Sequence, residues 1–214
     1  MYKSQCGQDK WLNENIFKNK KNGFFVDIGA HDGISLSNTY FYEKELDWKG
    51  ICIEPIPFVY QKLYKNRSCE CIHGCAYNRS GTIKFQQLEG YTEMLSGIDE
   101  AYNERHRQRV NRELEQHGDK RKYFDVNCFQ LSDILRSRGV KHVDYLSIDT
   151  EGSEMQVLSG INFDEVEIDV IDLEVNYRNE DEEKFNKYLE SKGYVFFTRL
   201  TDDNIYVNKK FFST

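Results

Sequence analysis

A short glycine-containing turn carries the residues with the clearest chemical meaning in this chain. It follows a β-rich run at 24–28 (Phe-Phe-Val-Asp-Ile) and reads Gly-Ala-His-Asp-Gly. In α/β proteins, ligands bind beyond the carboxyl ends of the strands, and a glycine-rich turn after the first strand is where nucleotide-like cofactors lie. The candidate cofactor-binding residues here are Asp27, Gly29, Ala30, His31, Asp32 and Gly33.

The spacing of this turn excludes two phosphate-binding motifs. A dinucleotide site requires G-x-G-x-x-G, whereas His31 and Ile34 stand where the second and third glycines would be. The Gly-Lys-Ser/Thr sequence of a P-loop does not follow either. Asp27 and Asp32 would also repel a pyrophosphate. A cofactor with cationic groups and no phosphate fits better, and S-adenosylmethionine, which carries an ammonium and a sulfonium, is such a cofactor.

A second acidic position supports a nucleoside site. Glu54 ends the apolar run 51–53 and lies 25 residues after Gly29. That is near the spacing at which an acidic residue accepts hydrogen bonds from ribose hydroxyls, and charge-assisted hydrogen bonds of this kind are strong and directional. Any one acidic residue at a strand end is usually a surface carboxylate. The combination of Asp27, Gly29, Gly33 and Glu54 favours a binding site.

Strand-like and helix-like segments alternate along most of the chain and must position these residues. We predict strands at 24–28, 51–53, 70–72, 83–85, 143–148, 168–174, 194–199 and 204–208, and helices at 35–47, 57–66, 131–138, 153–159 and 180–191. This alternation is typical of a mostly parallel α/β sheet with helices on both faces. A length of 214 residues suits one domain, so we treat 1–214 as a single domain.

Charge and composition exclude several other classes of protein. The 36 acidic and 29 basic side chains give a net charge of −7, which weighs against non-specific nucleic-acid binding. No apolar run approaches the ~18 residues of a membrane span. The polar N-terminus lacks the apolar region of a signal peptide, so we expect a cytoplasmic protein without a membrane partner. The sequence does not indicate an oligomeric state.

One segment differs in charge from the rest of the chain. Residues 102–123 carry seven Lys or Arg against four Asp or Glu. One interpretation is a solvated helix with ordinary charge pairing. The alternative is a basic arm that faces the substrate, and we predict a substrate-facing insertion at 92–123. The polar stretch 91–97 just before the basic residues is expected to line the acceptor pocket.

The six cysteines do not form a recognisable metal or disulfide pattern. They stand at positions 6, 52, 69, 71, 75 and 128. Residues 69, 71 and 75 have C-x-C-x3-C spacing, but a second pair that would complete a zinc tetrahedron is missing. Cys52 and Cys128 lie in apolar runs, where a thiol is a small buried hydrophobe. We therefore expect reduced, mostly buried thiols.

Three segments match a known family pattern. They read Phe-Val-Asp-Ile-Gly-Ala-His-Asp-Gly at 25–33, Ile-Glu-Pro at 53–55 and Asp-Tyr-Leu-Ser-Ile-Asp-Thr-Glu-Gly-Ser-Glu-Met-Gln-Val-Leu-Ser-Gly at 144–160. Together they resemble the FkbM family of S-adenosylmethionine-dependent methyltransferases. The resemblance covers residues 4–176 without 102–123, and the motif at 149–152 with Glu154 and Leu158 is its specific part. Thr150 departs from the pattern, because a small apolar residue is commoner there.

The resemblance implies a Rossmann-like class I methyltransferase fold. Its features are a mostly parallel seven-stranded sheet with an antiparallel final strand, helices on both faces and an inserted segment. For Gln8 it implies a place over the amino-acid end of the cofactor, and the alternative for this residue is a helix cap. Pro55, Cys75 and Ala76 are expected beside the nucleoside. The activity implied is O-methylation of a hydroxyl on a sugar or small metabolite.

Methyl transfer to a hydroxyl needs help with proton removal, because the pKa of the acceptor is high. The predicted strands that end at Asp149 and Glu174 reach the same sheet edge as Gly29. We predict Asp149 and Glu151 as the catalytic residues, acting as base or acceptor-orienting group. The alternative for Glu151 is a cap at the N-terminus of the next helix.

A metal ion is not part of the leading prediction. If one is present, Asp149, Glu174 and Asn176 offer the hard oxygen ligands that a divalent ion such as Mg²⁺ prefers. The spacing of these residues permits such a site without specifying it.

The leading prediction for function is a cofactor-dependent O-methyltransferase that acts on a small-molecule or glycan acceptor. A second interpretation is an RNA ribose or cap methyltransferase that binds RNA through residues 102–123. The net charge of −7 argues against it. A catalytically inactive cofactor-binding module is a third, and cofactor binding without methyl transfer would favour it.

Overall fold

One mixed sheet forms the centre of the computed structural model, which describes residues 1–176 and 180–213. Its described strands are β1 (Phe24–Ile28), β2 (Lys49–Glu54), β3 (Glu70–His73), β8 (His142–Ile148), β9 (Glu167–Glu174), β10 (Tyr194–Leu200) and β11 (Asp203–Asn208), and their order is β10-β11-β9-β8-β1-β2-β3. Strands β1, β2, β3, β8 and β9 run parallel, whereas β11 is antiparallel to both of its neighbours. This confirms the mostly parallel seven-stranded sheet and its antiparallel final strand.

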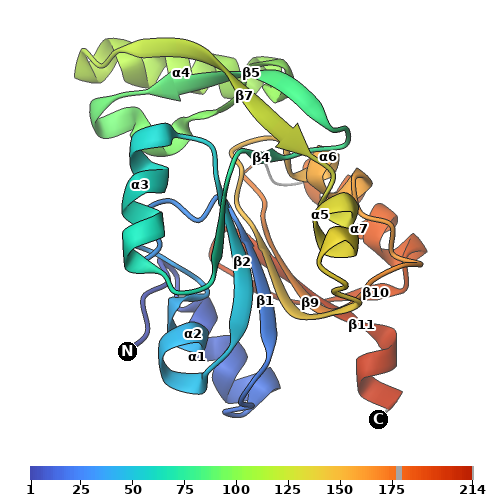
Figure 1. Cartoon of the computed structure of the whole chain (residues 1–214). Coiled ribbons are helices and arrows are strands. Elements are labelled where there is room, and N and C mark those ends of the chain that lie inside the picture. Colours follow the sequence, from blue (N-terminus) through green and yellow to red (C-terminus); the bar gives the residue numbers. More distant parts are fainter. Residues whose placement is uncertain (177–179, 214) are drawn as a thin grey trace.

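Helices cover both faces of the sheet, as predicted. Helices α1 (Gln8–Leu12), α2 (Tyr40–Leu46) and α3 (Pro57–Asn66) lie on one side in Figure 1, and α5 (Leu131–Ser137), α6 (Glu154–Ser159) and α7 (Glu180–Ser191) lie on the other. Successive side chains of a strand point to opposite faces. In β1, Phe25 therefore packs toward the first group of helices, while Val26 and Ile28 pack in the core of the second group.

Aromatic side chains anchor the N-terminal segment to the sheet. Tyr42 of α2 packs against Trp48 and Tyr145, with ring centroids 4.7 and 5.5 Å apart. Its hydroxyl donates a hydrogen bond of 2.8 Å to the carbonyl oxygen of Asp9. A π-helical turn, η1 (Asn13–Phe17), adds Phe17 to the same cluster. These contacts fix α1, and with it Gln8, beside the carboxyl end of the sheet.

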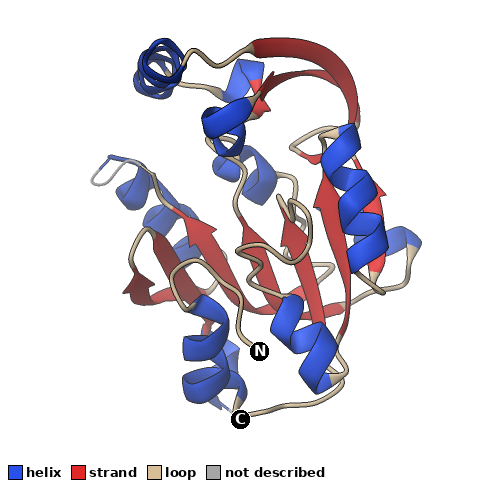
Figure 2. Ribbon diagram, turned by 90° about the vertical axis from the view of Figure 1, so that its left-hand side faces the viewer, coloured by secondary structure: helices blue, strands red, loops and turns tan. Residues whose placement is uncertain are grey.

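A second, smaller sheet lies at one end of the central sheet (Figures 1 and 2). Its described strands are β4 (Cys75–Ala76), β5 (Gly81–Leu88), β6 (Gly97–Ile98) and β7 (Arg121–Phe129), in the order β4-β7-β5-β6. Between β5 and β7 the chain also forms two 3-10 turns, η2 (Gly90–Leu95) and η3 (Asp99–Ala101), and helix α4 (Glu104–His117). The basic segment 102–123 is therefore helical only in α4, and its last residues begin β7, where they pair with β5. This second sheet, here called the additional sheet, also includes residues that come before and after the predicted insertion at 92–123 in the sequence.

The predicted helix at 35–47 starts later than expected. It begins at Tyr40, because the preceding residues form a turn held by side chains. Asp32 Oδ1 accepts hydrogen bonds from the amides of Ile34 and Ser35, at 2.9 and 2.7 Å, and Leu36 has a left-handed backbone with φ 58°. Side-chain oxygens that bind nearby amides compete with helix formation. Helix α1, which precedes the first strand, is also absent from the helices predicted above, although a helix cap is one interpretation of Gln8.

Within residues 1–176 and 180–213, every helix is too short or too polar to cross a lipid bilayer.

Candidate active site

Two adjoining pockets lie at the carboxyl ends of β1, β2 and β8. The first, here called the apolar pocket, encloses about 650 Å³ of space that is partly open to solvent. It is lined by Ile28, Ile53, Ile56, Phe85 and Ile98, with Glu54 and Asp149 among its polar residues. The second, here called the acidic pocket, is lined by Asp27, Asp149, Glu174, Asp202 and Asp203 among others. The two share Gly29, His31, Met94 and Asp149, so they form one continuous site.

Gly29 sits where the turns after β1 and β8 approach each other closely. Its φ is 86°, and a Cβ atom at this position would lie 1.8 Å from the carbonyl oxygen of Asp149. The amides of Gly29 and Ala30 both donate to the carbonyl oxygen of Ile53, at 3.0 and 3.1 Å. A glycine is required at position 29, because a side chain would force the turns after β1 and β8 apart.

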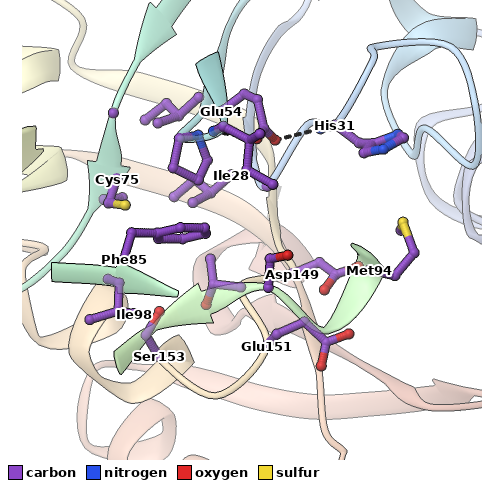
Figure 3. A pocket seen from close by; sticks show the side chains of 18 of the residues that line it. Ile28, His31, Glu54, Cys75, Phe85, Met94, Ile98, Asp149, Glu151 and Ser153 are labelled. Carbon is purple, nitrogen blue, oxygen red and sulfur yellow. Dashed lines mark hydrogen bonds between the residues drawn. The ribbon is translucent and has the colours of Figure 1, made fainter. Parts of the chain in front are cut away.

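Glu54 places a buried carboxylate in the wall of the apolar pocket, and it is only 4% exposed. Its two oxygens accept hydrogen bonds from the amides of His31, at 3.1 Å, and Ile56, at 2.8 Å. Figure 3 shows the first of these bonds and the side chains around it. Burial raises the pKa of Glu54 to about 8, against the effect of the two amides. Each carboxylate oxygen can accept a further hydrogen bond, and Glu54 can therefore receive two hydroxyls.

Three carboxylates form a cluster where the two pockets meet. Oxygens of Asp149, Glu151 and Glu174 lie within 4.8 Å of one another. Burial and nearby acidic groups raise the pKa of Asp149 to about 7, although Asp149 also accepts a hydrogen bond from Glu174. Burial and the neighbouring carboxylates raise the pKa values of Glu151 and Glu174 well above the ordinary value. The three carboxyls therefore bind protons more tightly than isolated ones do, and Glu174 donates its proton to Asp149.

Asn176 and Glu154 organise the backbone and side chains around this cluster. The Asn176 amide donates to Glu174 at 2.7 Å and to Glu151 at 3.3 Å. Glu154 accepts from the amides of Thr150 and Gly152, at 3.2 and 2.9 Å. Glu154, rather than Glu151, therefore binds the backbone before α6, and the alternative reading of Glu151 as a helix cap is wrong.

Three residues that line the two pockets, His31, Leu36 and Glu151, have a left-handed backbone although they are not glycine. The φ angles are 47° for His31 and 53° for Glu151. Such a conformation costs about 1–2 kcal/mol for residues with a Cβ atom, and it clusters at functional sites. It turns the Glu151 side chain toward Asp149 and Asn176, as the contacts above show. His31 Nε2 lies 3.5 Å from Glu93 Oε1 and so connects the turn after β1 to η2.

The acidic pocket is built by the N-terminal helix and the last strand. Gln8, which is buried, donates its side-chain amide to Asp203 and accepts from the amide of Cys6 at 2.8 Å. Burial raises the pKa of Asp203 to about 6. Asp27 accepts a hydrogen bond of 2.5 Å from the Thr39 hydroxyl, and burial raises its pKa. The pocket therefore concentrates acidic groups that attract a cationic ligand.

Most of the residues selected from the sequence come together here. The apolar pocket contains Gly29, His31, Glu54, Pro55, Cys75, Ala76, Asp149 and Glu151, and the acidic pocket contains Gln8, Asp27 and Ala30 together with Glu174. Asp32 and Gly33 are outside both linings and shape the turn instead. Asp32 binds the amides of the next residues, and a Cβ at Gly33 would lie 2.6 Å from Leu63.

Several residues of the site are not among the individual residues selected from the sequence. Glu93, Met94 and Ser96 belong to the stretch 91–97, which is expected to line the acceptor pocket, and the structure places them in the lining of the apolar pocket. Phe85 and Ile98 were not foreseen, because they are ordinary apolar positions of strands. Asp203 could have been found, because the first residue of an antiparallel strand lies at the same edge as the carboxyl ends of parallel ones.

Ser153 was also missed and differs from the others in having an unused polar atom. It is 1% exposed, and its hydroxyl oxygen has no hydrogen-bond partner among the described residues. The residue lines the apolar pocket near Phe85 and Ile98 (Figure 3). Because buried polar groups are normally satisfied, this hydroxyl is a candidate contact for a bound ligand.

The predicted metal ligands need one correction. Asn176 uses its amide nitrogen toward Glu151 and Glu174, and its oxygen accepts from Arg109 Nη1 at 3.3 Å. Asn176 therefore does not direct an oxygen into the cluster. Carboxylates alone, Asp149, Glu151 and Glu174, remain as hard ligands that could hold a divalent ion.

Comparisons with known proteins identify the family of this chain. A family model described as the methyltransferase FkbM domain matches residues 27–196. Methyltransferase sdnD of Sordaria araneosa is 28% identical over 160 residues, which cover 66% of this chain and 61% of that protein. The crystal structure of methyltransferase FkbM from Methylobacillus flagellatus shares the fold, with a TM-score of 0.52 and 15% identity over 88% of this chain and 44% of that one. The chain thus spans about three fifths of the curated relative and less than half of the solved one. Because the family model covers more than half of its length, the chain belongs to the FkbM family of methyltransferases.

Proposed function

We propose that this protein transfers a methyl group from S-adenosylmethionine to a hydroxyl of a sugar or small metabolite. The observation that carries the proposal is the junction of the two pockets at Gly29 and Asp149. One pocket has mostly apolar walls with the buried carboxylate of Glu54 among them, and the other is strongly acidic. An adenosine with a cationic amino-acid tail combines these same properties.

Each part of the cofactor has a proposed partner in the chain. Ile56, Phe85 and Ile98 provide apolar walls for the adenine, beside Cys75 and Ala76. Glu54 receives the ribose hydroxyls, since its oxygens retain acceptor capacity. The ammonium group is attracted to the acidic pocket, where Asp27 and Asp203 lie and where Gln8 holds Asp203 in position.

Asp149 and Glu151 are proposed to act on the acceptor. When bound, the cofactor supplies an electrophilic methyl carbon on sulfur. Asp149 or Glu151 would orient the acceptor hydroxyl and take up its proton as the new oxygen–carbon bond forms and the methyl–sulfur bond breaks, which leaves a neutral thioether. A pKa near 7 at Asp149 suits this role, because a general base is most effective when its pKa lies near the working pH.

A metal ion is not needed for this reaction scheme. Burial and the neighbouring carboxylates raise the pKa of Glu174 and so lower the negative charge of the cluster, and Arg109 and Asn176 supply hydrogen-bond donors beside it. Treatment with EDTA is therefore expected to leave methyl transfer unchanged. Loss of activity that Mg²⁺ restores would instead assign Asp149, Glu151 and Glu174 as metal ligands.

Binding of S-adenosylhomocysteine, measured by calorimetry, tests the cofactor site. Glu54→Ala removes two charge-assisted hydrogen bonds, each worth about 1.5–3 kcal/mol, so affinity should fall at least ~100-fold. Glu167→Ala is the matched control, because Glu167 is exposed at the opposite end of β9. Unchanged affinity in Glu54→Ala, or preferential binding of a nucleotide with phosphates, would contradict the assignment.

Transfer of a labelled methyl group to a panel of hydroxyl compounds tests the reaction. Turnover with a sugar or small metabolite supports the proposal, and cofactor binding without turnover on any acceptor favours an inactive binding module. RNA is the less favoured acceptor, because arginines of α4 already have partners: Arg107 contacts Asp99, and Arg109 contacts Glu113. Methylation of RNA that weakens as salt is added would instead make RNA the favoured acceptor.

A further inference from the structure

Two cysteines outside the two pockets lie in sulfur–sulfur contact. Cys52 in the middle of β2 is 0% exposed, and Cys69 precedes β3 and is partly exposed. Their Sγ atoms are 3.5 Å apart. Cys69 also lines a surface hollow together with Lys44, Lys49 and Arg138, so it can be reached from solvent. A buried thiol thus lies directly behind an accessible one.

The surroundings of Cys69 favour its thiolate. A hydrogen bond from the Cys52 thiol, together with the positive charge of Arg67, lowers the pKa of Cys69 to about 5, although burial and Glu43 act in the opposite direction. The Arg67 side chain is 0% exposed and also contacts Glu43 and Asp27, at 2.5 and 4.0 Å. Thiolates, rather than thiols, are the nucleophilic form of cysteine.

We propose that Cys69 and Cys52 form a site of reversible oxidation by peroxides, in which Cys69 is the attacking residue and Cys52 the resolving one. The two sulfurs must approach by ~1.5 Å to reach the ~2.05 Å of a disulfide. Cys71 is less suited as the partner, because its thiol already donates to the carbonyl oxygen of Cys69 at 3.6 Å. The proposal does not depend on the methyl transfer proposed above.

The reaction balances with a peroxide as the only other reactant. The Cys69 thiolate attacks one peroxide oxygen, the oxygen–oxygen bond breaks, and the departing hydroxide takes up a proton to become water. The product is a sulfenic acid on Cys69. The Cys52 sulfur then attacks the Cys69 sulfur, the sulfur–oxygen bond breaks, and a second water leaves. Two thiols are oxidised to one disulfide, and hydrogen peroxide is reduced to two waters.

The remaining cysteines provide internal controls. Cys75 and Cys128 are paired across β4 and β7, and both are buried in one core cluster. Strand neighbours without a short sulfur contact are poorly placed for a disulfide, because its geometry is specific. Cys6 is partly exposed and gives a reference for an accessible thiol in the same chain.

The first experiment treats the full-length protein with a small excess of hydrogen peroxide and counts free thiols after denaturation. The count should fall from six to four, and peptide mapping should find one link, between Cys52 and Cys69. A reducing agent should restore all six thiols. A link between Cys69 and Cys71 or between Cys75 and Cys128, or no link at all, would overturn the proposal.

Single variants separate the two roles. Cys52→Ser should stop the reaction at the sulfenic acid, so that dimedone labels Cys69, whereas Cys69→Ser should neither form a link nor react with dimedone at Cys52. Cys128→Ser is the matched control and should form the Cys52–Cys69 link as the unaltered protein does. Dimedone labelling that does not increase at Cys69 in Cys52→Ser would contradict the order of attack.

A measurement on the unaltered protein covers the case in which a variant fails to fold. Alkylation of Cys69 by iodoacetamide, followed by mass spectrometry, should have nearly the same rate at about pH 6 and about pH 8. The rate of a short cysteine peptide measured alongside should fall by roughly 10-fold per pH unit below the ordinary thiol pKa of about 8.5, because only the thiolate reacts. The same steep fall at Cys69 would remove the proposed nucleophile.

Discussion

Arg109 Nη1 donates a hydrogen bond to Asn176 Oδ1 over 3.3 Å. This bond connects helix α4, which lies between β6 and β7 of the additional sheet, to the cluster of Asp149, Glu151 and Glu174. Through its amide nitrogen, Asn176 contacts both Glu151 and Glu174. The positive charge of Arg109 also opposes the rise of the Glu151 pKa that burial and Asp149 cause. The basic segment thus contributes to the site through a charge placed behind the carboxylates.

Replacing Arg109 should therefore shift the pH dependence of the reaction. Arg109→Gln removes the positive charge, the pKa of Glu151 rises further, and the acidic limb of kcat should move upward by about one pH unit. At neutral pH we expect kcat to fall roughly 10-fold, while the affinity for S-adenosylhomocysteine changes little.

Arg112→Gln is the control for this prediction, because Arg112 is an exposed arginine of the same helix. Its pH profile should match that of the unaltered protein. Equal shifts in the two variants would show that only the overall charge of α4 matters, and the specific role of Arg109 would be lost.

The close approach at Gly29 predicts a large effect of one added carbon atom. In Gly29→Ala, the Cβ atom would overlap the Asp149 carbonyl oxygen, so the turns after β1 and β8 must separate. We expect a loss of at least ~3 kcal/mol in the free energy of unfolding and loss of cofactor binding. Urea denaturation and calorimetry measure the two effects.

Gly139→Ala separates the overlap from backbone strain. Gly139 also has a left-handed backbone, with φ 68°, but a Cβ there would have no atom within 4 Å among the described residues. This variant should lose only about 1 kcal/mol. Similar losses in the two variants would mean that the left-handed conformation, and not the contact with Asp149, makes glycine necessary at position 29.

The sequence predicted those site residues that lie at or next to the end of a β-rich run. Asp27 is the last but one residue of β1, Glu54 is the last of β2 and Asp149 directly follows β8, and the carboxyl ends of parallel strands meet at one sheet edge. Their convergence follows from strand order alone. The motif at 149–152 indicated the family, and the fold of that family implies the arrangement of the strands.

The parts that could not be predicted depend on long-range packing. Phe85 and Ile98 have the same alternating pattern as core residues elsewhere, and only the folded additional sheet brings them to the pocket. The late start of α2 depends on how Asp32 and Ser37 bind backbone amides. The left-handed backbone of Glu151 likewise has no signature in a sequence, because glutamate rarely adopts it.

The protonated carboxyls predict that stability falls as pH rises. Asp149, Asp203 and Glu54 have pKa values of about 7, 6 and 8, above the ordinary values of 3.8 and 4.5. Between about pH 4 and 8 the folded chain therefore binds more protons than the unfolded one, so these groups stabilise it fully only below that window. The Tm without ligand should fall across it.

Glu174→Gln tests this directly, because glutamine keeps the donor to Asp149 without needing a proton. The variant should gain stability over the unaltered protein by up to about 1.4 kcal/mol per pH unit above pH 4, and the gain should vanish near pH 4. Thermal unfolding at several pH values measures it. Glu167→Gln, an exposed residue of the same strand, should show no such slope, and a gain independent of pH would contradict the explanation.

The raised pKa of Glu54 predicts how cofactor affinity depends on pH. Only the ionised carboxylate can accept hydrogen bonds from both ribose hydroxyls, so the affinity for S-adenosylhomocysteine should rise by up to ~10-fold per pH unit and level off above about pH 8. Glu54→Gln should bind S-adenosylhomocysteine more weakly, and its affinity should no longer show the part of the pH dependence that Glu54 causes. Any pH dependence of the affinity that Asp149 or Asp203 causes should be the same in both proteins. Calorimetry from about pH 6 to 8.5 measures the difference. An identical slope in the two proteins would show that Glu54 does not titrate on binding, and its proposed contact with the ribose would then be wrong.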